Sequence, residues 1–178
     1  IRLVVTSPLQ RCAVTAQDIV AAQPEGPPAH VDERVVEVRY GAWTGRPLKD
    51  LASEHLWSAI QSRPSSVTFP ADPVHASESM TAMADRAWAA WKEWEQAVAE
   101  AHGTHAVWAL VSHGDVIKAL LATSLGMDLD AFQSIVVDPA SVSVVHRMGD
   151  RTAVGAMNIR EDLISRLATS PPSSSEQP

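Results

Sequence analysis

The stretch Val107-Trp-Ala-Leu-Val-Ser-His-Gly-Asp-Val-Ile117 decides the fold of this chain. Its apolar first half indicates a buried strand, and the helical spacing of apolar residues over 116–125 indicates a helix that Asp115 opens. We therefore expect His113 to lie at the carboxyl edge of a sheet, beside Gly114 and a helix N-terminus. Ligands of open α/β sheets bind at such edges, and backbone N–H groups there favour anions. From this spacing alone, His113 could equally cap the helix or pack in a loop.

The N-terminal segment repeats the pattern of strand followed by helix. Residues 1–6 are rich in Val and Leu, as in a strand buried on both faces. The pair Ser7-Pro8 predicts a helix start, with Ser as N-cap and Pro in the first helical position. Arg11 falls in the first turn, where a basic residue opposes the helix dipole by about 0.3–1 kcal/mol. A bound anion would remove that cost, and the alternative is a solvent-exposed arginine.

The next segments predict a loop, a short strand and a second loop with polar residues. Residues 23–29 hold three prolines and a glycine, which indicates a loop, and residues 30–36 suit a short strand. In Glu37-Val-Arg-Tyr-Gly-Ala-Trp-Thr-Gly45, two glycines interrupt regular structure between charged and aromatic side chains. Functional residues favour such loops on a rigid scaffold, although a purely structural turn around a buried Trp43 would have the same sequence pattern.

A long helix follows an irregular stretch. Residues 48–60 predict a short, broken helix, and the Pro/Ser-rich segment 62–73 predicts a surface excursion that could serve as a lid. Ser79 begins a helix to about Ala101, which Gly103 closes. One face of this helix carries apolar residues that we interpret as core rather than as an interaction surface. They are Met80, Met83, Ala87, Trp91, Trp94 and Val98.

The C-terminal third predicts a hairpin and then a tail. A short helix is expected over 130–135, and the alternating segments 141–147 and 152–158 flank Gly149-Asp150, which is a hairpin signal. Alternating strands and helices predict an α/β fold, a three-layer α/β/α arrangement with a mostly parallel central sheet. We expect a single domain over residues 1–167, with a last turn at 162–167, and a disordered Ser/Pro-rich tail over 168–178.

Composition limits the classes of function. With 46% apolar and 20% charged residues, the chain of 178 residues is typical of a globular domain. A net charge of −7 argues against nucleic-acid binding, because a phosphate backbone needs a basic face. No apolar run approaches the roughly 20 residues that span a bilayer, and no signal-peptide pattern is present, so no membrane partner is expected. The single cysteine, Cys12, fits a reducing compartment, and we expect a cytoplasmic location.

Three polar residues are expected to meet at the carboxyl edge of the sheet. Arg11 follows the first strand, Glu37 the second and His113 the third. An arginine fork holds two phosphate oxygens, a histidine can donate to a third oxygen or attack phosphorus, and a glutamate of raised pKa can act as a general acid. Together they suit phosphoryl transfer, which depends on positioning and charge neutralisation.

Other chemistries fit less well. The pair His102 and His105 has a spacing known from zinc sites, but Gly103 interrupts it and no acidic or cysteine partner is near, so a surface loop is the simpler interpretation and no metal is expected. The chain also lacks the Gly-x-Ser-x-Gly, Gly-x-Gly-x-x-Gly and P-loop patterns.

The motifs together resemble a known family. Thr6-Ser-Pro-Leu-Gln-Arg-Cys-Ala-Val-Thr-Ala16, the loop 37–45 and Val111-Ser-His-Gly-Asp-Val-Ile-Lys118 are similar, in this order, to the blocks of the histidine phosphatase superfamily, phosphoglycerate-mutase-like branch 1. The resemblance covers about residues 1–160. It implies that Arg11 and Gly114 bind the phosphate, that Glu37 is the general acid, and that His113 is the second histidine of the phosphate pocket. It also implies a phosphohistidine intermediate and no cofactor or metal.

One family motif is absent. Family members form the phosphohistidine within an Arg-His-Gly motif on a central strand, and this chain contains no Arg-His-Gly. A sheet that lacks its middle strand is expected to leave unpaired backbone on both neighbouring strands. We therefore predict that roughly 40–60 upstream residues, enough for a strand, a loop and a helix, are missing from this sequence.

The resemblance leaves three functions open. A phosphatase acting on a small phosphorylated metabolite is favoured over a phosphoglycerate mutase, because mutases of the family carry adjacent arginines in a longer insertion and this chain has no Arg-Arg pair. The third alternative is a non-catalytic phosphate-binding relative, and a homodimer is left open. The basic residues between Glu37 and His113 are Arg39, Arg46, Lys49, Arg63, Arg86 and Lys92.

Overall fold

The structure is a computed structural model that describes residues 1–160. The turn expected at 162–167, the end of the predicted domain at residue 167 and the tail expected over 168–178 lie outside the described residues.

Three short parallel strands form the sheet on which the motifs depend. They are β1 (Val4–Thr6), β2 (Ala29–Val31) and β3 (Ala109–Val111), in the order β2-β1-β3. Val5 of the central strand pairs with His30 on one side and with Leu110 on the other. Because all three strands are parallel, their carboxyl ends share one edge, as the sequence predicted.

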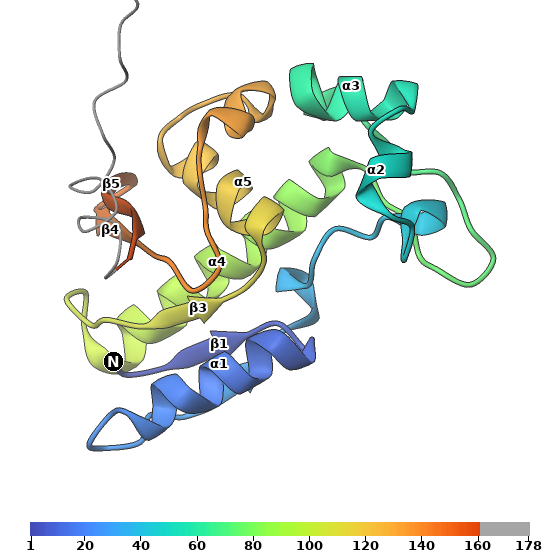
Figure 1. The fold of residues 1–178 in the computed structure, drawn as a ribbon. Helices are drawn as coiled ribbons and strands as arrows, with labels where there is room; N and C mark the ends of the chain where they lie inside the picture. The colour runs from blue at the N-terminus through green and yellow to red at the C-terminus, as the bar shows by residue number, and fades with distance from the viewer. Residues whose placement is uncertain (161–178) are drawn as a thin grey trace, which may run out of the picture.

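Helices cover both faces of this sheet, so the predicted α/β fold is confirmed (Figure 1). Helix α1 (Gln10–Ala21) lies on one side, and α4 (Met80–His102) and α5 (Gly114–Ser124) lie on the other. The β1 side chain of Val5 packs with Leu3 against Val98 of α4.

The long helix has the limits and the buried face that its sequence predicts. The Ser79 side chain accepts a hydrogen bond from the Ala82 N–H, and Gly103 ends the helix with a φ of 87°. Met80 and Met83 are fully buried in the main core, which α5 and the 3₁₀ helix η4 (Leu129–Ser134) complete.

The segment between the second strand and α4 is made of short helices. It contains the 3₁₀ helices η1 (Glu33–Val35) and η2 (Gly41–Trp43), then α2 (Leu48–Leu51), α3 (His55–Ser62) and η3 (Pro64–Ser66). The expectation of a lid over residues 62–73 is wrong, because Val67 and Phe69 are buried in the main core. Phe69 also donates its N–H to the Glu78 carbonyl, which fastens the segment to the start of α4.

The predicted hairpin is confirmed as a separate two-stranded sheet. Strands β4 (Val142–Met148) and β5 (Arg151–Ile159) pair antiparallel and are not hydrogen-bonded to the parallel sheet. The hairpin is anchored to helices instead: Arg147 forms an ion pair with Glu95 of α4, and the Thr152 hydroxyl donates to the Ser124 carbonyl at the end of α5 at 2.8 Å.

One expectation about the N-terminal region is wrong. Helix α1 begins at Gln10 with Leu9 in the N-cap position and without a side-chain cap, so Ser7 does not cap it. In the sheet, β1 pairs with β3 on one edge and with β2 on the other, whereas the second edge of β3 pairs with no strand of residues 1–160.

Candidate active site

The three side chains that follow the three strands meet at the carboxyl edge of the sheet. Nη2 of Arg11 lies 2.8 Å from Nδ1 of His113 and 3.9 Å from Oε2 of Glu37. The Glu37 carboxylate lies 3.8 Å from the same Nδ1 atom. The sequence expectation that these three residues converge is therefore met by the geometry.

The strand ends themselves bring these residues together. The Asp32 N–H donates to the Thr6 carbonyl at 2.9 Å, and the Ser7 N–H donates to the Val111 carbonyl at 2.9 Å. These bonds tie the residues just after β2 and β1 to the ends of their neighbours. These hydrogen bonds therefore fix the ends of the strands from which the chain continues to the site residues.

His113 is more deeply buried than Arg11 and Glu37. Its side chain is only 1% exposed, and Nε2 lies 2.7 Å from the Ser7 hydroxyl oxygen. Burial, followed by the charges of Arg11 and Arg86, lowers the pKa of His113 to about 4. The imidazole is therefore neutral at physiological pH.

A cysteine packs against the imidazole. The Cys12 thiol lies 3.6 Å from Nε2 and 3.8 Å from Nδ1 of His113, and it donates to the Ser112 carbonyl at 3.4 Å. Burial raises the pKa of Cys12, which keeps the thiol protonated. Cys12 therefore places no charge beside the imidazole ring.

Glu37 lies in an environment that favours its protonated form. Its side chain is 20% exposed. Burial, with a further contribution from the Asp115 charge, raises the pKa of Glu37 to about 7, although Oε1 accepts the Val38 N–H at 3.1 Å and Arg11 is near. A carboxyl group with a pKa near working pH can both give and take a proton.

Asp115 is a second carboxyl group of the site. Its Oδ2 atom accepts a hydrogen bond from the Tyr40 hydroxyl at 3.1 Å, and burial raises its pKa. Tyr40 also contacts Phe69 edge-on, at 5.0 Å between ring centroids, which connects the site to the main core. Burial raises the pKa of Tyr40 as well, so its hydroxyl stays a donor.

Arg11 and Gly114 lie on the open side of the site. The Arg11 side chain is 62% exposed while its end reaches His113, so its remaining N–H groups can meet a ligand from solvent. Gly114 is exposed and begins α5, with His113 in the N-cap position. No neighbouring atom lies within 4 Å of the place where a side chain at Gly114 would begin, so a ligand can approach that backbone.

Two site residues escaped the sequence prediction of roles. The sequence predicts Ser7 as a helix cap and Asp115 as the first residue of a helix. Both residues stand next to the Arg11 and His113 motifs, which is the one feature of the sequence that points to a role in the site. Their contacts, Ser7 with His113 and Asp115 with Tyr40, join residues 106 and 75 positions apart and form only in the folded protein.

A sequence model of the histidine phosphatase superfamily, branch 1, matches residues 1–160. The chain belongs to this superfamily. Membership places it in the histidine-type phosphatase class of enzymes. Phosphoserine phosphatase 1 of Hydrogenobacter thermophilus is 26% identical over 159 residues, which cover 88% of this chain and 70% of that protein.

Solved structures share the fold of this histidine phosphatase. A mycobacterial glucosyl-3-phosphoglycerate phosphatase matches with a TM-score of 0.71 and 23% identity, over 88% of this chain and 76% of that one. The alpha-ribazole phosphatase of Shigella flexneri matches with a TM-score of 0.66 and 23% identity, over 89% and 73% of the two chains. The phosphoglycerate-mutase-like arrangement predicted from the motifs is thereby confirmed.

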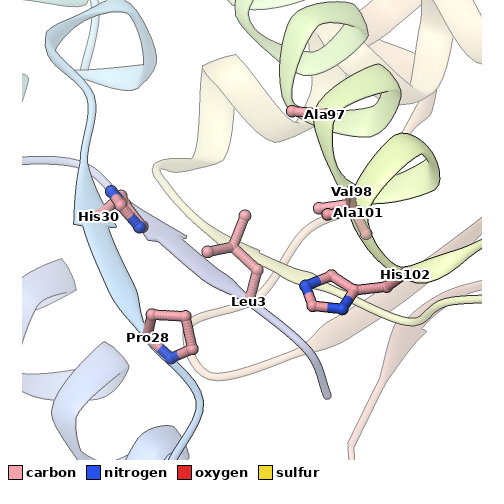
Figure 2. Close-up of a pocket in the computed structure, with 7 residues that line it drawn as sticks. All are labelled: Leu3, Pro28, His30, Ala97, Val98, Ala101 and His102. Carbon is pink, nitrogen blue, oxygen red and sulfur yellow. The ribbon is translucent and has the colours of Figure 1, made fainter.

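A depression at the opposite edge of the sheet is separate from this site (Figure 2). Leu3, which precedes β1, and the rings of His30 and His102 border it. Because the site residues follow the strands, this depression lies at the other end of the sheet. His102 therefore lies at the end of α4, away from the candidate active site.

Residues 1–160 contain neither a cluster of metal ligands nor a helix that could span a membrane. In this part of the chain, no three His, Cys, Asp or Glu side chains cluster in a way that could hold a metal ion. Its helices are also either too short or too polar to cross a membrane.

Proposed function

We propose that this histidine phosphatase hydrolyses small phosphate monoesters through a phosphohistidine. The observation that supports the proposal is the meeting of Arg11, Glu37 and His113 within 4 Å at the carboxyl edge of the sheet. In the proposal Arg11 and the Gly114 backbone bind phosphate oxygens, Glu37 protonates the leaving oxygen, and His113 donates to the phosphoryl group. No metal is assigned a role.

The contacts of His113 favour a supporting role over that of nucleophile. Arg11 is a pure donor, so its contact occupies the Nδ1 lone pair, and the proton then resides on Nε2. A nucleophile needs a free lone pair, and neither nitrogen offers one. A phosphate oxygen could instead replace the Ser7 hydroxyl as acceptor of the Nε2 proton. The nucleophile of the proposal is the histidine of an Arg-His-Gly motif, which these 178 residues do not contain.

The two steps of the proposal exchange one proton through Glu37. In the first step the histidine nitrogen bonds to phosphorus, the P–O bond breaks, and protonated Glu37 gives its proton to the departing oxygen. In the second step water attacks the phosphohistidine, the P–N bond breaks, and Glu37 takes a proton from that water. The products are an alcohol and inorganic phosphate. A carboxyl group with a pKa of about 7 is suited to both steps.

Relatives support phosphatase over mutase activity. The Hydrogenobacter relative bears the name of a phosphoserine phosphatase, and one structural relative that of a glucosyl-3-phosphoglycerate phosphatase. The substrate class proposed here, a small phosphorylated metabolite, agrees with both names. A cytoplasmic location belongs to the same proposal.

The general-acid role of Glu37 is tested with two substrates of different leaving groups. Glu37→Gln should reduce kcat about 100-fold or more with an alkyl phosphate, whose leaving oxygen needs a proton, and far less with p-nitrophenyl phosphate. Glu33→Gln, an exposed glutamate four positions earlier, is the control and should leave both rates unchanged. Equal losses on both substrates would remove Glu37 from the general-acid role.

The competing functions are separated on the full-length protein. A panel of phosphate monoesters should release inorganic phosphate, while 3-phosphoglycerate should not be converted to its 2-isomer. Isomerisation without phosphate release would establish the mutase instead. Binding of phosphate without turnover of any monoester would establish the non-catalytic alternative.

A further inference from the structure

The segment that carries Glu37 is held from behind by the N-terminal part of α4. The Arg86 guanidinium donates from Nη1 to the Arg34 carbonyl at 2.7 Å and from Nη2 to the Glu37 carbonyl at 3.2 Å. One side chain therefore fixes the main chain at two points, three residues apart. The second of these points is the residue whose carboxyl group enters the site.

A buried carboxylate completes this grip. Arg86 binds Glu78 through two parallel contacts, Nη2 to Oε1 at 2.6 Å and Nε to Oε2 at 3.0 Å. Glu78 in turn accepts the Arg39 N–H on Oε1 at 3.0 Å, and its own N–H donates to the Arg39 carbonyl at 3.1 Å. The main chain on both sides of Glu37 is thus attached to one ion pair.

The ion pair is shielded from water. The Arg86 and Glu78 side chains are 15% and 8% exposed, whereas the Arg34–Glu93 pair on the same segment is 38% and 68% exposed. Screening weakens exposed pairs much more than buried ones. Hydrogen bonds at fixed angles from a planar guanidinium also define a geometry that a flexible ammonium group cannot reproduce.

We propose that Arg86 is the positioning residue for Glu37: with Glu78 it clamps residues 34–39 and sets where the Glu37 carboxyl group stands relative to Arg11 and His113. The effect of Arg86 on catalysis rests on the proposed function. The effect of Arg86 on the position of Glu37 does not depend on that function. Arg86 touches no reacting atom in this scheme.

The charge of Arg86 has a second effect on the site. It lowers the pKa of Glu37 and that of His113, in both cases after larger influences. Besides burial, Asp115 raises the pKa of Glu37, whereas the Val38 N–H and Arg11 lower it. Removal of the Arg86 charge should therefore move the pKa of Glu37 upward.

The test compares Arg86→Gln and Arg86→Lys with Arg147→Gln in the full-length protein. Arg147→Gln is the matched control, because it removes an arginine of the hairpin that pairs with Glu95, a carboxylate of α4. Three quantities are measured: amide hydrogen exchange at Val38 and Arg39, the Glu37 carboxyl pKa from ¹³C NMR, and kcat and KM with an alkyl phosphate.

Arg86→Gln should speed exchange at both amides roughly 10-fold or more. The Val38 and Arg39 amides donate to the Glu37 and Glu78 carboxylates, and without Arg86 these acceptors are no longer held in place. It should also raise the pKa of Glu37 and lower kcat about 10–100-fold, the scale of a 1 Å misplacement, with little change in KM. Arg86→Lys keeps the charge without the fork, so it should hold the Glu37 pKa near that of the wild type while exchange and kcat still change. This variant also serves if Arg86→Gln does not fold.

Loss of global stability alone would overturn the proposal. If both Arg86 variants match Arg147→Gln, with exchange at the two amides and the Glu37 signal as in the wild type, Arg86 is merely structural. Failure of the proposed function looks different. In that case Glu37→Gln loses equal activity on both leaving groups, while exchange and the carboxyl signal still report whether Arg86 positions Glu37.

Discussion

Arg11 Nη2 lies 2.8 Å from His113 Nδ1, and this contact fixes the protonation of the histidine. A guanidinium has no acceptor, so Nδ1 must offer its lone pair and the proton must sit on Nε2, facing the Ser7 hydroxyl. The arginine expected to bind phosphate is thus also the residue that selects the tautomer of its neighbour.

Removal of the Arg11 charge should make His113 easier to protonate. The wild-type imidazole, with a pKa of about 4, should stay neutral with its proton on Nε2 from pH 5 to 8. Arg11→Gln should raise that pKa, because the positive charge beside the ring is gone. ¹⁵N NMR of the imidazole measures both tautomer and titration. Arg2→Gln, which removes an exposed arginine paired with Glu25, is the control and should change neither.

Glu37 should make the fold less stable as pH rises from about 4.5 to 7. Its folded-state pKa of about 7 exceeds the ordinary value of 4.5, so between these pH values the folded state binds more protons than the unfolded state. The free energy of unfolding therefore falls as the pH rises across this window. Glu37→Gln cannot ionise. Its Tm relative to wild type should therefore be higher at pH 8 than at pH 4.5. A difference in Tm that does not depend on pH would contradict the raised pKa.

Ser7→Ala should destabilise the protein through His113 rather than through α1. Without the hydroxyl, a buried Nε2 proton has lost its acceptor, which costs about 1–3 kcal/mol. In a His113→Ala background the same change should cost much less, giving an interaction energy of about 1 kcal/mol or more in denaturant unfolding. Equal costs in the two backgrounds would return Ser7 to a local role at the helix start.

Gly41→Ala should destabilise the protein far more than Gly45→Ala. Both glycines have positive φ, 53° and 78°, which costs an L-residue about 1–2 kcal/mol. Only at Gly41 would a Cβ also meet backbone, 2.0 Å from the Pro70 carbonyl oxygen, whereas Gly45 faces open space. Thermal unfolding measures the loss of stability in each variant. Similar losses would show that the loop at Pro70 can move to accommodate the Cβ without destabilising the protein.

The sequence predicted the site better than its immediate surroundings. Strand ends of a parallel sheet must share an edge, so alternating strands and helices sufficed to bring Arg11, Glu37 and His113 together. The helix α4 was equally predictable, because its cap at Ser79 and its stop at Gly103 are local signals.

Non-local contacts account for the errors. Ser7 has the residue type of a helix cap, but its hydroxyl oxygen lies 2.7 Å from a histidine 106 positions away and accepts only the Leu9 N–H, at 3.3 Å, from the start of α1. The Pro/Ser-rich composition of residues 62–73 predicts an excursion over the surface, yet two of its side chains, Val67 and Phe69, are buried in the core. The clamp of Arg86 on the Glu37 segment was likewise invisible, because carbonyl acceptors carry no signature in the sequence.

The direct pairing of β1 with β3 has a consequence for how this protein folds. Arg11 and His113 are 102 positions apart, and they meet only when a loop of that length has closed. Loop closure of this kind is an entropic cost that must be met before the contacts it permits can form, and folds built on such contacts form slowly. The site should therefore be among the last parts of the molecule to assemble, and a chain with helices but without this pairing would not bring Arg11 and His113 together.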